Sequence, residues 1–367
     1  MISIYEKYAQ VLIHYSLELK KNEKLMIRST PNAAPLVKYC YKEAVLAGAH
    51  PETFLNISGM GKILLDYGTE EQIKYLSPTA LFFVDNFDVF LNINAPYSLK
   101  SLQRVDPQKI KIANESNTPV TERFFERTKN GELRWCGCEY PSYAQSQECG
   151  MGLDDYENFL LKSCFIFEDD PVAKWKELHD HQQKIVNYLN KCEKIQYRGK
   201  DIDVEFSCKG RPWVNCDGKV NMPDGEVFTS PVEDSVNGKI RFSYPGIFMG
   251  NEIEDILLEI KDGQVIKWKA EKGQKLLDQI MGIPGARRFG EAAVGTNYLI
   301  NEFTKNMLFD EKIGGTIHMA LGHSLPDSRG ENKSTIHWDL LADMREDSEI
   351  IADSEVIYKN GKFIIGD

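Results

Sequence analysis

The residues best suited to chemistry lie in the second half of the chain, and the clearest local sign is a histidine two positions before an aspartate. His337 and Asp339 close the segment Ser334–Asp339. If this segment is a strand, side chains two positions apart point to the same face, so an imidazole nitrogen and a carboxylate oxygen can reach one point. Mixed nitrogen and oxygen ligation suits Zn²⁺, Co²⁺ or Mn²⁺. Taken alone, the pair is a weak signal, because His-x-Asp pairs are common on exposed strands.

Three further residues could contribute to such a site. His318 lies in the apolar, glycine-flanked segment Gly314–Gly322, where a histidine is either a ligand or a hydrogen-bonded core residue. Glu291 leads into the apolar run Ala292–Val294, and a carboxylate buried there must be paired or coordinated, because an uncompensated charge costs several kcal/mol or more. An arginine just upstream could supply that pairing. Glu226 follows a turn and starts a short β-like run, where it could also be a solvated loop carboxylate.

The five side chains fit one common scheme. Glu226, Glu291, His318, His337 and Asp339 supply enough donors for two divalent ions bridged by a carboxylate and a water. Two such ions lower the pKa of the water, polarise a carbonyl group and hold a substrate. The net charge of −11, from 44 basic and 55 acidic residues, is compatible with binding cations. It makes nucleic acid and anionic membrane surfaces poor partners.

The elements that must position these residues follow from the pattern of apolar side chains. In the first half, helices are expected near residues 4–19 and 34–44, and strands at residues 24–29, 53–57, 81–84 and 89–94. The repeated strand-then-helix order predicts a mainly parallel sheet covered by helices. No glycine-rich phosphate loop follows any of these strands, so a nucleotide site is not indicated.

The second half is richer in strands. Helices at residues 154–164 and 171–192 precede a change of character, after which we expect strands at residues 195–197, 202–206, 239–242 and 256–260 and one helix at 271–281. Asp262-Gly263 and Asn360-Gly361 each predict a tight β-hairpin. On a prior of roughly 150 residues per domain, the chain predicts two domains. They are an α/β domain with a mainly parallel sheet at residues 1–193 and a β-rich α+β domain at residues 194–367 that carries the metal ligands.

The overall composition is that of an ordinary soluble globular protein, with 42% hydrophobic and 27% charged residues. The eight cysteines are scattered and form no CxxC pair, so we expect reduced, mostly buried thiols in a cytoplasmic protein. No run approaches the roughly 20 apolar residues of a membrane span, and the N-terminal residues lack the pattern of a secretory signal. Neither a membrane nor a disulfide framework is therefore expected.

Four segments resemble, in order and with broadly similar gaps, the M29 family of metallo-aminopeptidases of the aminopeptidase T and aminopeptidase S type. The segments are Asn221–Pro231, Gly285–Glu291, Asp310–Gly322 and Ser334–Asp339, and the resemblance extends over essentially the whole chain. It implies that the five side chains hold the two divalent ions, Zn, Co or Mn, of an exopeptidase. It also implies a homodimer enclosing a cavity that admits peptides and excludes folded proteins.

The resemblance adds one acidic residue and breaks at one position. Glu311 resembles a sixth ligand of the family, with a small difference in length between it and His318. A tyrosine that family members commonly carry seven residues after this histidine, thought to assist catalysis, is replaced here by Leu325. Because leucine can neither donate a hydrogen bond nor carry a proton, either His323 or a water stabilises the oxyanion, or turnover is weak. Losing one such donor typically costs on the order of 100- to 1000-fold in rate.

The sequence therefore predicts a metal-dependent aminopeptidase that releases N-terminal amino acids from peptides through a bridging water activated by two metal ions. Glu291 is expected either to be shared by both ions next to that water or to shuttle a proton. Two alternatives stay open: another metal-assisted hydrolase, such as an amidase or phosphoesterase, and a weakly active metal-dependent peptide-binding protein. A phosphoesterase would need basic residues converging on the site, and only Arg287, Arg288 and Arg329 are near in sequence.

Overall fold

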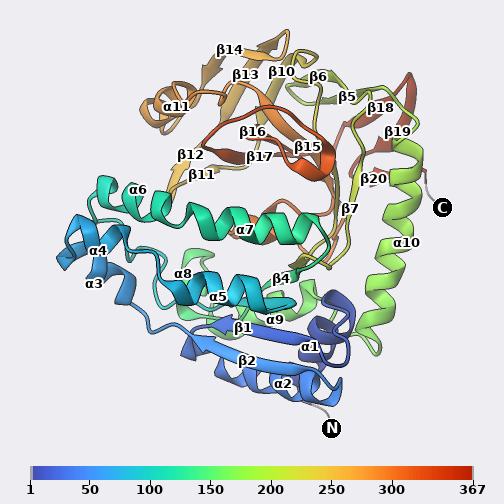
Figure 1. Cartoon of the computed structure of the whole chain (residues 1–367). Coiled ribbons are helices and arrows are strands. Elements are labelled where there is room, and N and C mark those ends of the chain that lie inside the picture. The colour runs from blue at the N-terminus through green and yellow to red at the C-terminus, as the bar shows by residue number, and fades with distance from the viewer. Residues whose placement is uncertain (1–2, 366–367) are drawn as a thin grey trace. The chain divides into compact units, whose positions relative to one another are not determined.

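The computed structural model describes residues 3–365, which form two compact units (Figure 1). The first unit holds the chain up to Val172 together with Gly218–Met222, and the second holds Ala173–Asp217 and the chain from Pro223 onward. Helix α10 (Pro171–Leu189), which precedes the expected boundary at residue 193, lies almost entirely in the second unit. The chain therefore passes into the second unit after Val172, returns to the first unit for Gly218–Met222, and continues in the second unit from Pro223.

The first unit is built on a five-stranded sheet whose strands are all parallel, in the order β2-β1-β3-β4-β8. The strands are β1 Lys24–Ser29, β2 His50–Leu55, β3 Val89–Asn94, β4 Arg134–Glu139 and β8 Asn221–Met222. Strands β1 and β3 are buried over most of their length, as expected for inner strands of a parallel sheet with apolar runs such as Leu25–Ile27. The predicted α/β architecture with a mainly parallel sheet is confirmed.

Helices accompany this sheet, and one of them replaces an expected strand. They are α1 Ile4–Gln10, which continues into a π-helical segment at Val11–Ser16, α2 Ala34–Leu46, α3 Met60–Tyr67, α4 Glu70–Lys74, α5 Pro78–Asn86, α6 Pro107–Ser116, α7 Thr118–Lys129, α8 Tyr143–Glu148 and α9 Leu153–Ser163. The strand expected at residues 81–84 is wrong, because these residues lie in α5. Pro78 in the first turn presets a helical φ, and the apolar run covers two sides of the helix, with Val84 buried and Phe82 exposed.

The second unit contains two larger antiparallel sheets that share one hydrophobic core. The eight-stranded sheet has the order β14-β13-β10-β6-β5-β18-β19-β20, and the five-stranded sheet has the order β17-β16-β15-β9-β7. The former comprises β5 Lys194–Gly199, β6 Ile202–Ser207, β10 Asn237–Phe242, β13 Ile256–Lys261, β14 Gln264–Lys269, β18 Glu349–Ala352, β19 Glu355–Lys359 and β20 Lys362–Phe363. The latter comprises β7 Val214–Cys216, β9 Glu226–Thr229, β15 Phe289–Gly295, β16 Thr316–Gly322 and β17 His337–Asp343. A short hairpin of β11 Gly246–Phe248 and β12 Asn251–Ile253, helix α11 Gln274–Met281 and helix α12 Met307–Asp310 complete the unit.

Both predicted hairpins of the second unit are confirmed. Asp262 and Gly263, between β13 and β14, have φ values of 49° and 72°, and Asn360 and Gly361, between β19 and β20, have 48° and 86°. Two successive positive φ values are what a type I′ turn requires. The turn residues therefore determine how these strands pair.

Alternation along the strands separates a core face of the five-stranded sheet from a second face. On β15, β16 and β17, three neighbouring strands of this sheet, the side chains in the core include Ala292, Val294, Ile317, Met319, Leu321, Trp338, Leu340 and Ala342. The residues between them, including His318 and Asp339, point to the opposite face, because successive side chains of a strand alternate. This second face is therefore free to carry polar groups.

The expectations about cysteines and membrane helices can be compared directly with the structure. All eight cysteines are free thiols, and five of them are buried, namely Cys40, Cys136, Cys138, Cys164 and Cys208. Within the described part of the chain, no helix combines the length and apolar character needed to cross a bilayer.

Candidate metal centre

Five of the predicted ligands lie on four neighbouring strands of the five-stranded sheet. Glu226 opens β9, Glu291 lies in β15, His318 lies in β16, and His337 and Asp339 lie in β17. The strand order β17-β16-β15-β9 makes these strands direct neighbours. Residues that are far apart in the sequence are thus brought together by antiparallel pairing.

A β-bulge directs Glu291 away from the core. The register between β15 and β16 shifts between Phe289 and Glu291, so Phe289 belongs to the hydrophobic core whereas Glu291, two positions later, does not. Such an irregularity re-aims the side chain that follows it. Gly290 is required at this point, because a Cβ there would lie 2.3 Å from the carbonyl oxygen of His323.

Each of the five predicted ligands has an alanine or glycine opposite it on one neighbouring strand, although Leu341 also lies opposite His318 and Cys216 opposite Glu226 on their other neighbours. The pairs are Glu226 with Gly295, Glu291 with Ala320, His318 with Ala293, His337 with Gly322 and Asp339 with Ala320. Directly opposed Cβ atoms lie about 4.5–5.5 Å apart. Larger residues at these positions would therefore occupy the space in which the donor atoms meet.

Glu291 lies at the centre of the group. Its Oε1 is 3.5 Å from Nε2 of His318, and its Oε2 is 3.1 Å from Nε2 of His337. His318 Nε2 is also 3.3 Å from Oε2 of Glu226, and His337 Nε2 is 3.5 Å from Oδ1 of Asp339. One carboxylate thus connects both histidines, and each histidine reaches a second carboxylate.

The donor atoms form three sets in which every atom lies within 4.8 Å of the others. The sets are Glu226–Glu291–His318, Glu291–His337–Asp339 and Glu311–His318–Asp339. Glu311, at the C-terminal cap of α12, is therefore brought to the group despite the small difference in length noted above. Donors bound to one ion at about 2 Å lie within roughly 4 Å of each other, so small movements would place each set around a divalent cation.

Burial leaves several of these atoms without a hydrogen bond, although they lie close to oppositely charged groups. Glu226, Glu291, His318 and Asp339 expose between 1% and 7% of their surface, and 27% of the His337 side chain is accessible. Among the described residues, Oε2 of Glu226, both ring nitrogens of His318 and Oδ1 of Asp339 have no hydrogen-bond partner. Buried polar atoms without partners are costly, and bound cations would satisfy them.

Neighbouring charges shift the pKa values of these groups. Burial raises the pKa of Glu226. For Glu291 and Asp339 burial acts in the same direction, but the contacts with histidine outweigh it and lower both pKa values. For the histidines burial acts to lower the pKa, but the carboxylates outweigh it, raising the pKa of His318 and bringing that of His337 to about 11. With no ion bound, His337 therefore holds a proton at neutral pH, and the shift of His318 favours its protonated form.

Lys312 also belongs to this group, and sequence reasoning missed it. The side chain is fully buried, its Nζ is 3.5 Å from Oε1 of Glu226, and it contacts the carboxylate of Glu311. Its position directly after Glu311 was the only sequence signal available. The candidate centre therefore contains a cationic side chain as well as carboxylates and histidines.

His323 contributes through its backbone. The carbonyl oxygen of His323 accepts a hydrogen bond from Nδ1 of His337 at 2.7 Å, which leaves Nε2 facing Glu291 and Asp339. This contact sets the orientation of the His337 ring. The His323 side chain is exposed, and among the described residues no hydrogen bond or ion pair links its imidazole to the five ligands. Its predicted role in stabilising an oxyanion stays a prediction.

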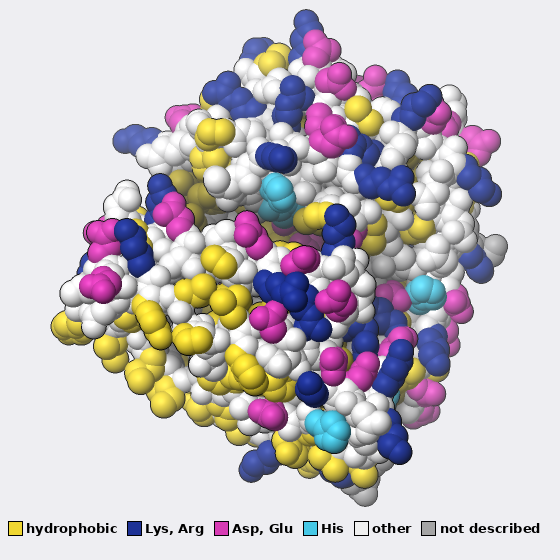
Figure 2. Space-filling model, viewed as in Figure 1, with side chains coloured by type: hydrophobic (Ala, Val, Ile, Leu, Met, Phe, Trp, Pro, Cys, Tyr) yellow, Lys and Arg dark blue, Asp and Glu magenta, His cyan; other side chains and the backbone are white. Residues whose placement is uncertain are grey.

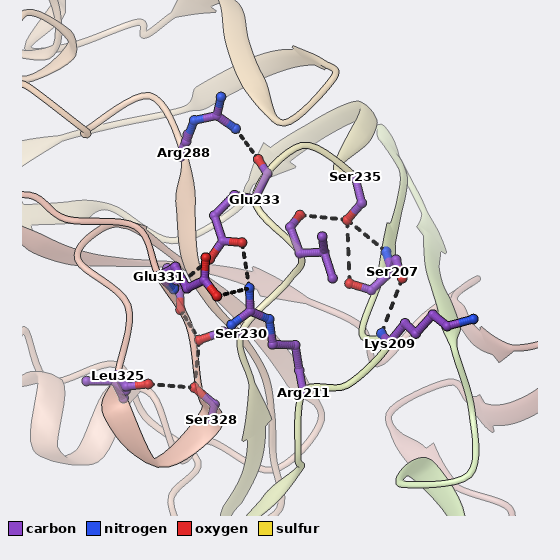
Figure 3. Close-up of polar contacts among 12 residues, drawn as sticks. Ser207, Lys209, Arg211, Ser230, Glu233, Ser235, Arg288, Leu325, Ser328 and Glu331 are labelled. Carbon is purple, nitrogen blue, oxygen red and sulfur yellow. Dashed lines mark hydrogen bonds and ion pairs between the residues drawn. The ribbon is translucent and has the colours of Figure 1, made fainter.

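The loop between β16 and β17 is attached to the sheet by buried serines (Figure 3). The Ser230 hydroxyl donates to the carbonyl of Gly290 at 2.6 Å and lies 2.6 Å from the hydroxyl of Ser328. Ser328 in turn is 3.0 Å from the carbonyl oxygen of Leu325. Because Gly290 precedes Glu291, these contacts join the loop to the strand that carries the central carboxylate.

A second attachment of this loop uses charged groups, which Figure 3 shows beside the serines. Glu233 accepts from the Arg211 guanidinium and from the backbone N–H of Glu331, each at 2.6 Å. Arg288 donates to the carbonyl of Glu233. The loop that contains Leu325 is thus fixed at two points.

Comparison with known proteins gives consistent results. The model of the family described as thermophilic metalloprotease (M29) matches residues 3–363. Aminopeptidase 2 of Geobacillus stearothermophilus is 30% identical, in an alignment covering 92% of this chain and 91% of that protein. Aminopeptidase PepS of Streptococcus thermophilus is 28% identical, with 98% of each chain covered.

A solved structure supports the fold. Wild-type AmpT from Thermus thermophilus is similar to this chain with a TM-score of 0.85 over 99% of both chains, at 22% sequence identity. At that identity the similarity establishes the fold alone. Both units have counterparts in that protein, because the match spans the whole chain.

The raised histidine pKa values predict that divalent ions displace protons. Adding Zn²⁺ to metal-free protein at pH 7.5 should release protons, since His337 is protonated at this pH and must lose its proton before it can bind an ion. The release should decline as the pH rises to about 11 and above, where a growing fraction of His337 is already neutral. Calorimetric titration in two buffers of different ionisation enthalpy measures it. Equal apparent enthalpies in the two buffers would contradict the prediction, and a His337→Gln variant should release fewer protons.

Proposed function

The chain belongs to the thermophilic metalloprotease family M29, and on that premise we propose that it is a metal-dependent aminopeptidase that removes N-terminal residues from peptides. The observation that carries the proposal is the convergence of Glu226, Glu291, His318, His337 and Asp339 on one sheet face. The relatives that match over nearly their full length are named aminopeptidases, which supports exopeptidase activity on peptides.

We propose two metal ions as cofactors, held by two donor sets that share Glu291. One set is Glu226, Glu291 and His318, and the other is Glu291, His337 and Asp339, with Glu311 as a further donor. The mixture of carboxylate oxygen and imidazole nitrogen suits Zn²⁺, Co²⁺ or Mn²⁺. The buried atoms of Glu226, His318 and Asp339 that make no hydrogen bond among the described residues support this assignment.

When bound, such ions lower the pKa of a water molecule and polarise the scissile carbonyl. Glu291 would either be the carboxylate shared by the two donor sets beside the attacking water, or accept a proton from that water and return it to the leaving amine. The surrounding carboxylates would attract the positively charged amino terminus of a peptide. His337, oriented by the carbonyl of His323, would keep its Nε2 directed at the centre.

The surroundings of the centre argue against the phosphoesterase alternative. Arg287 donates to the carbonyl of Met281 and stacks on Trp268, and Arg288 is engaged by the carbonyl of Glu233. Lys312 is the basic side chain in direct contact with the predicted ligands, and it is paired with two glutamates. A phosphate would thus meet mainly carboxylates. An amidase acting on other substrates remains the alternative within hydrolases.

We further propose that the chain forms a homodimer through an apolar surface of its first unit. Figure 2 shows hydrophobic side chains gathered over the region of α3, α5 and β2. They are Phe54, Leu55, Ile57, Met60, Ile63, Leu64, Tyr67 and Phe82. β2 is also an edge strand, and contiguous apolar surface beside an unpaired edge is typical of an interface.

We also propose a cytoplasmic location for the protein. The free thiols are consistent with it, because the cytoplasm keeps cysteines reduced.

The metal centre can be tested with Glu291→Gln. The substitution removes the shared negative charge and the proton acceptor, so kcat/KM for a leucyl anilide should fall by about 100-fold or more. Metal content measured on the same samples separates the two roles of Glu291: a ligand loses metal, whereas a proton shuttle keeps it. Glu302→Gln, at an exposed glutamate of the same unit, is the matched control. Two bound ions without cleavage under Zn²⁺, Co²⁺ or Mn²⁺ would indicate a peptide-binding protein instead.

Leu325→Tyr tests whether the missing phenol limits turnover. The loop is held through the backbone carbonyl of Leu325, so the substitution should leave its course unchanged. We expect kcat to rise, by up to about 100-fold if the phenol donates to the oxyanion. Leu325→Phe, which supplies the ring without the hydroxyl, should give no increase. If the tyrosine variant is no faster than wild type, the phenol is not what limits this enzyme.

The dimer can be tested by placing a charge in the apolar surface. Ile63→Asp should convert a dimer into a monomer, because a carboxylate would be buried without a partner in the interface. Light scattering after size-exclusion chromatography measures the mass. Ile266→Asp is the control, since Ile266 lies in the second unit and is exposed to a similar extent, 50% against 55%. A wild-type chain that is monomeric at micromolar concentration would contradict the proposal.

A further inference from the structure

Lys312 has an unusual environment for a lysine. Its side chain is fully buried, whereas lysine is rarely buried unless it is paired. The ammonium contacts Glu311 and lies 3.5 Å from Oε1 of Glu226. Asp224 and Cys216 are also among the groups that act on it electrostatically. The lysine is thus surrounded by acidic and thiol groups.

These surroundings form a cation-binding set of their own. Donor atoms of Cys216, Asp224 and Glu226 lie within 4.8 Å of one another. Cys216 on β7 pairs directly across the sheet with Glu226 on β9, so the thiol and the carboxylate are cross-strand neighbours. A sulfur and two carboxylate oxygens could hold a divalent ion, and the Lys312 ammonium lies 3.5 Å from the carboxylate of one of these residues, Glu226.

The positive charge of Lys312 balances part of the negative charge of the neighbouring carboxylates. The carboxylates of the cluster are Asp224, Glu226, Glu291, Glu311 and Asp339, with a total charge of −5 when all are ionised. Two divalent ions supply +4 and Lys312 supplies +1, so the loaded cluster is neutral. Burial without a net charge avoids the large cost of an uncompensated ion. The negative charge of Glu226 acts on Lys312 more strongly than any other group, and it keeps the pKa of the ammonium raised although burial acts to lower it.

We propose that Lys312 is a fixed cation of the metal centre, filling the position beside Cys216, Asp224 and Glu226 that a further divalent ion would otherwise take. Lys312 thereby limits the centre to two ions and keeps Cys216 from becoming a ligand. It is a positioning residue, because it acts on Glu226 and Glu311 and not on a substrate. The inference rests on the proposed metal centre.

Lys312→Ala in the full chain tests this assignment. Removing the ammonium should allow one additional Co²⁺ per chain to bind, with loss of the Cys216 proton to solvent. Five carboxylates and one thiolate would then balance three divalent ions. The additional ion should produce thiolate-to-cobalt charge-transfer absorption in the near ultraviolet, which wild type should lack.

Matched variants make the assignment specific. Lys312→Ala with Cys216→Ser should lose the charge-transfer absorption, and Lys312→Arg, which retains the charge, should behave as wild type. A folded Lys312→Ala variant with neither the absorption nor the additional ion would overturn the proposal. The same absorption in wild type, abolished by Cys216→Ser, would also overturn it.

A second measurement needs no bound ion. Lys312→Met keeps most of the side-chain volume and removes the charge. In metal-free protein the variant should unfold at a temperature lower by about 5 °C or more, because Glu226 and Glu311 lose their buried partner. An unchanged melting temperature would contradict the role of fixed cation. If wild type binds no divalent ion, the proposed function fails, whereas this comparison still decides the role of Lys312.

Discussion

The structure of the second unit depends on one constraint: several carboxylates lie close together where water has little access. Glu226, Glu291 and Asp339 are each at least nine-tenths buried. Carboxylates in such a position must be neutralised or coordinated, because the free energy of burying uncompensated charge exceeds what packing can supply. The histidines, Lys312 and the proposed ions all place positive charge beside these carboxylates and so meet this requirement.

The sheet meets the constraint by separating two kinds of surface. Alternation places large apolar side chains in the shared core and leaves the other face for the ligands. On that face an alanine or glycine stands opposite each predicted ligand on one neighbouring strand, which leaves room on that side for the donor atoms. The bulge at Gly290 turns Glu291 outward, and the adjacent hydrogen bond from Ser230 holds that strand to the loop. The ligand geometry is therefore a property of the whole sheet.

Much of this arrangement could be predicted from the sequence, for identifiable reasons. The two-residue spacing of His337 and Asp339 indicated a shared face directly, and Glu291 stood out because a carboxylate precedes an apolar run. Lys312 could not be found in this way, since its partner Glu226 lies on a strand far from it in sequence. Residues 81–84 were misassigned because a short apolar run fits a strand as well as a helix until Pro78 is given its weight.

Protons and ions are alternative means of balancing the same charges. Without ions, the carboxylates raise the pKa values of His318 and His337, which favours positively charged rings beside them. Together with the ammonium of Lys312, these rings reduce the repulsion among the carboxylates in the metal-free protein. On the proposed function, ion uptake would exchange protons for cations in a site whose donors are already close together. Lys312 would take no part in that exchange, so under the proposal above a residue that binds no ion would limit how many ions the centre holds.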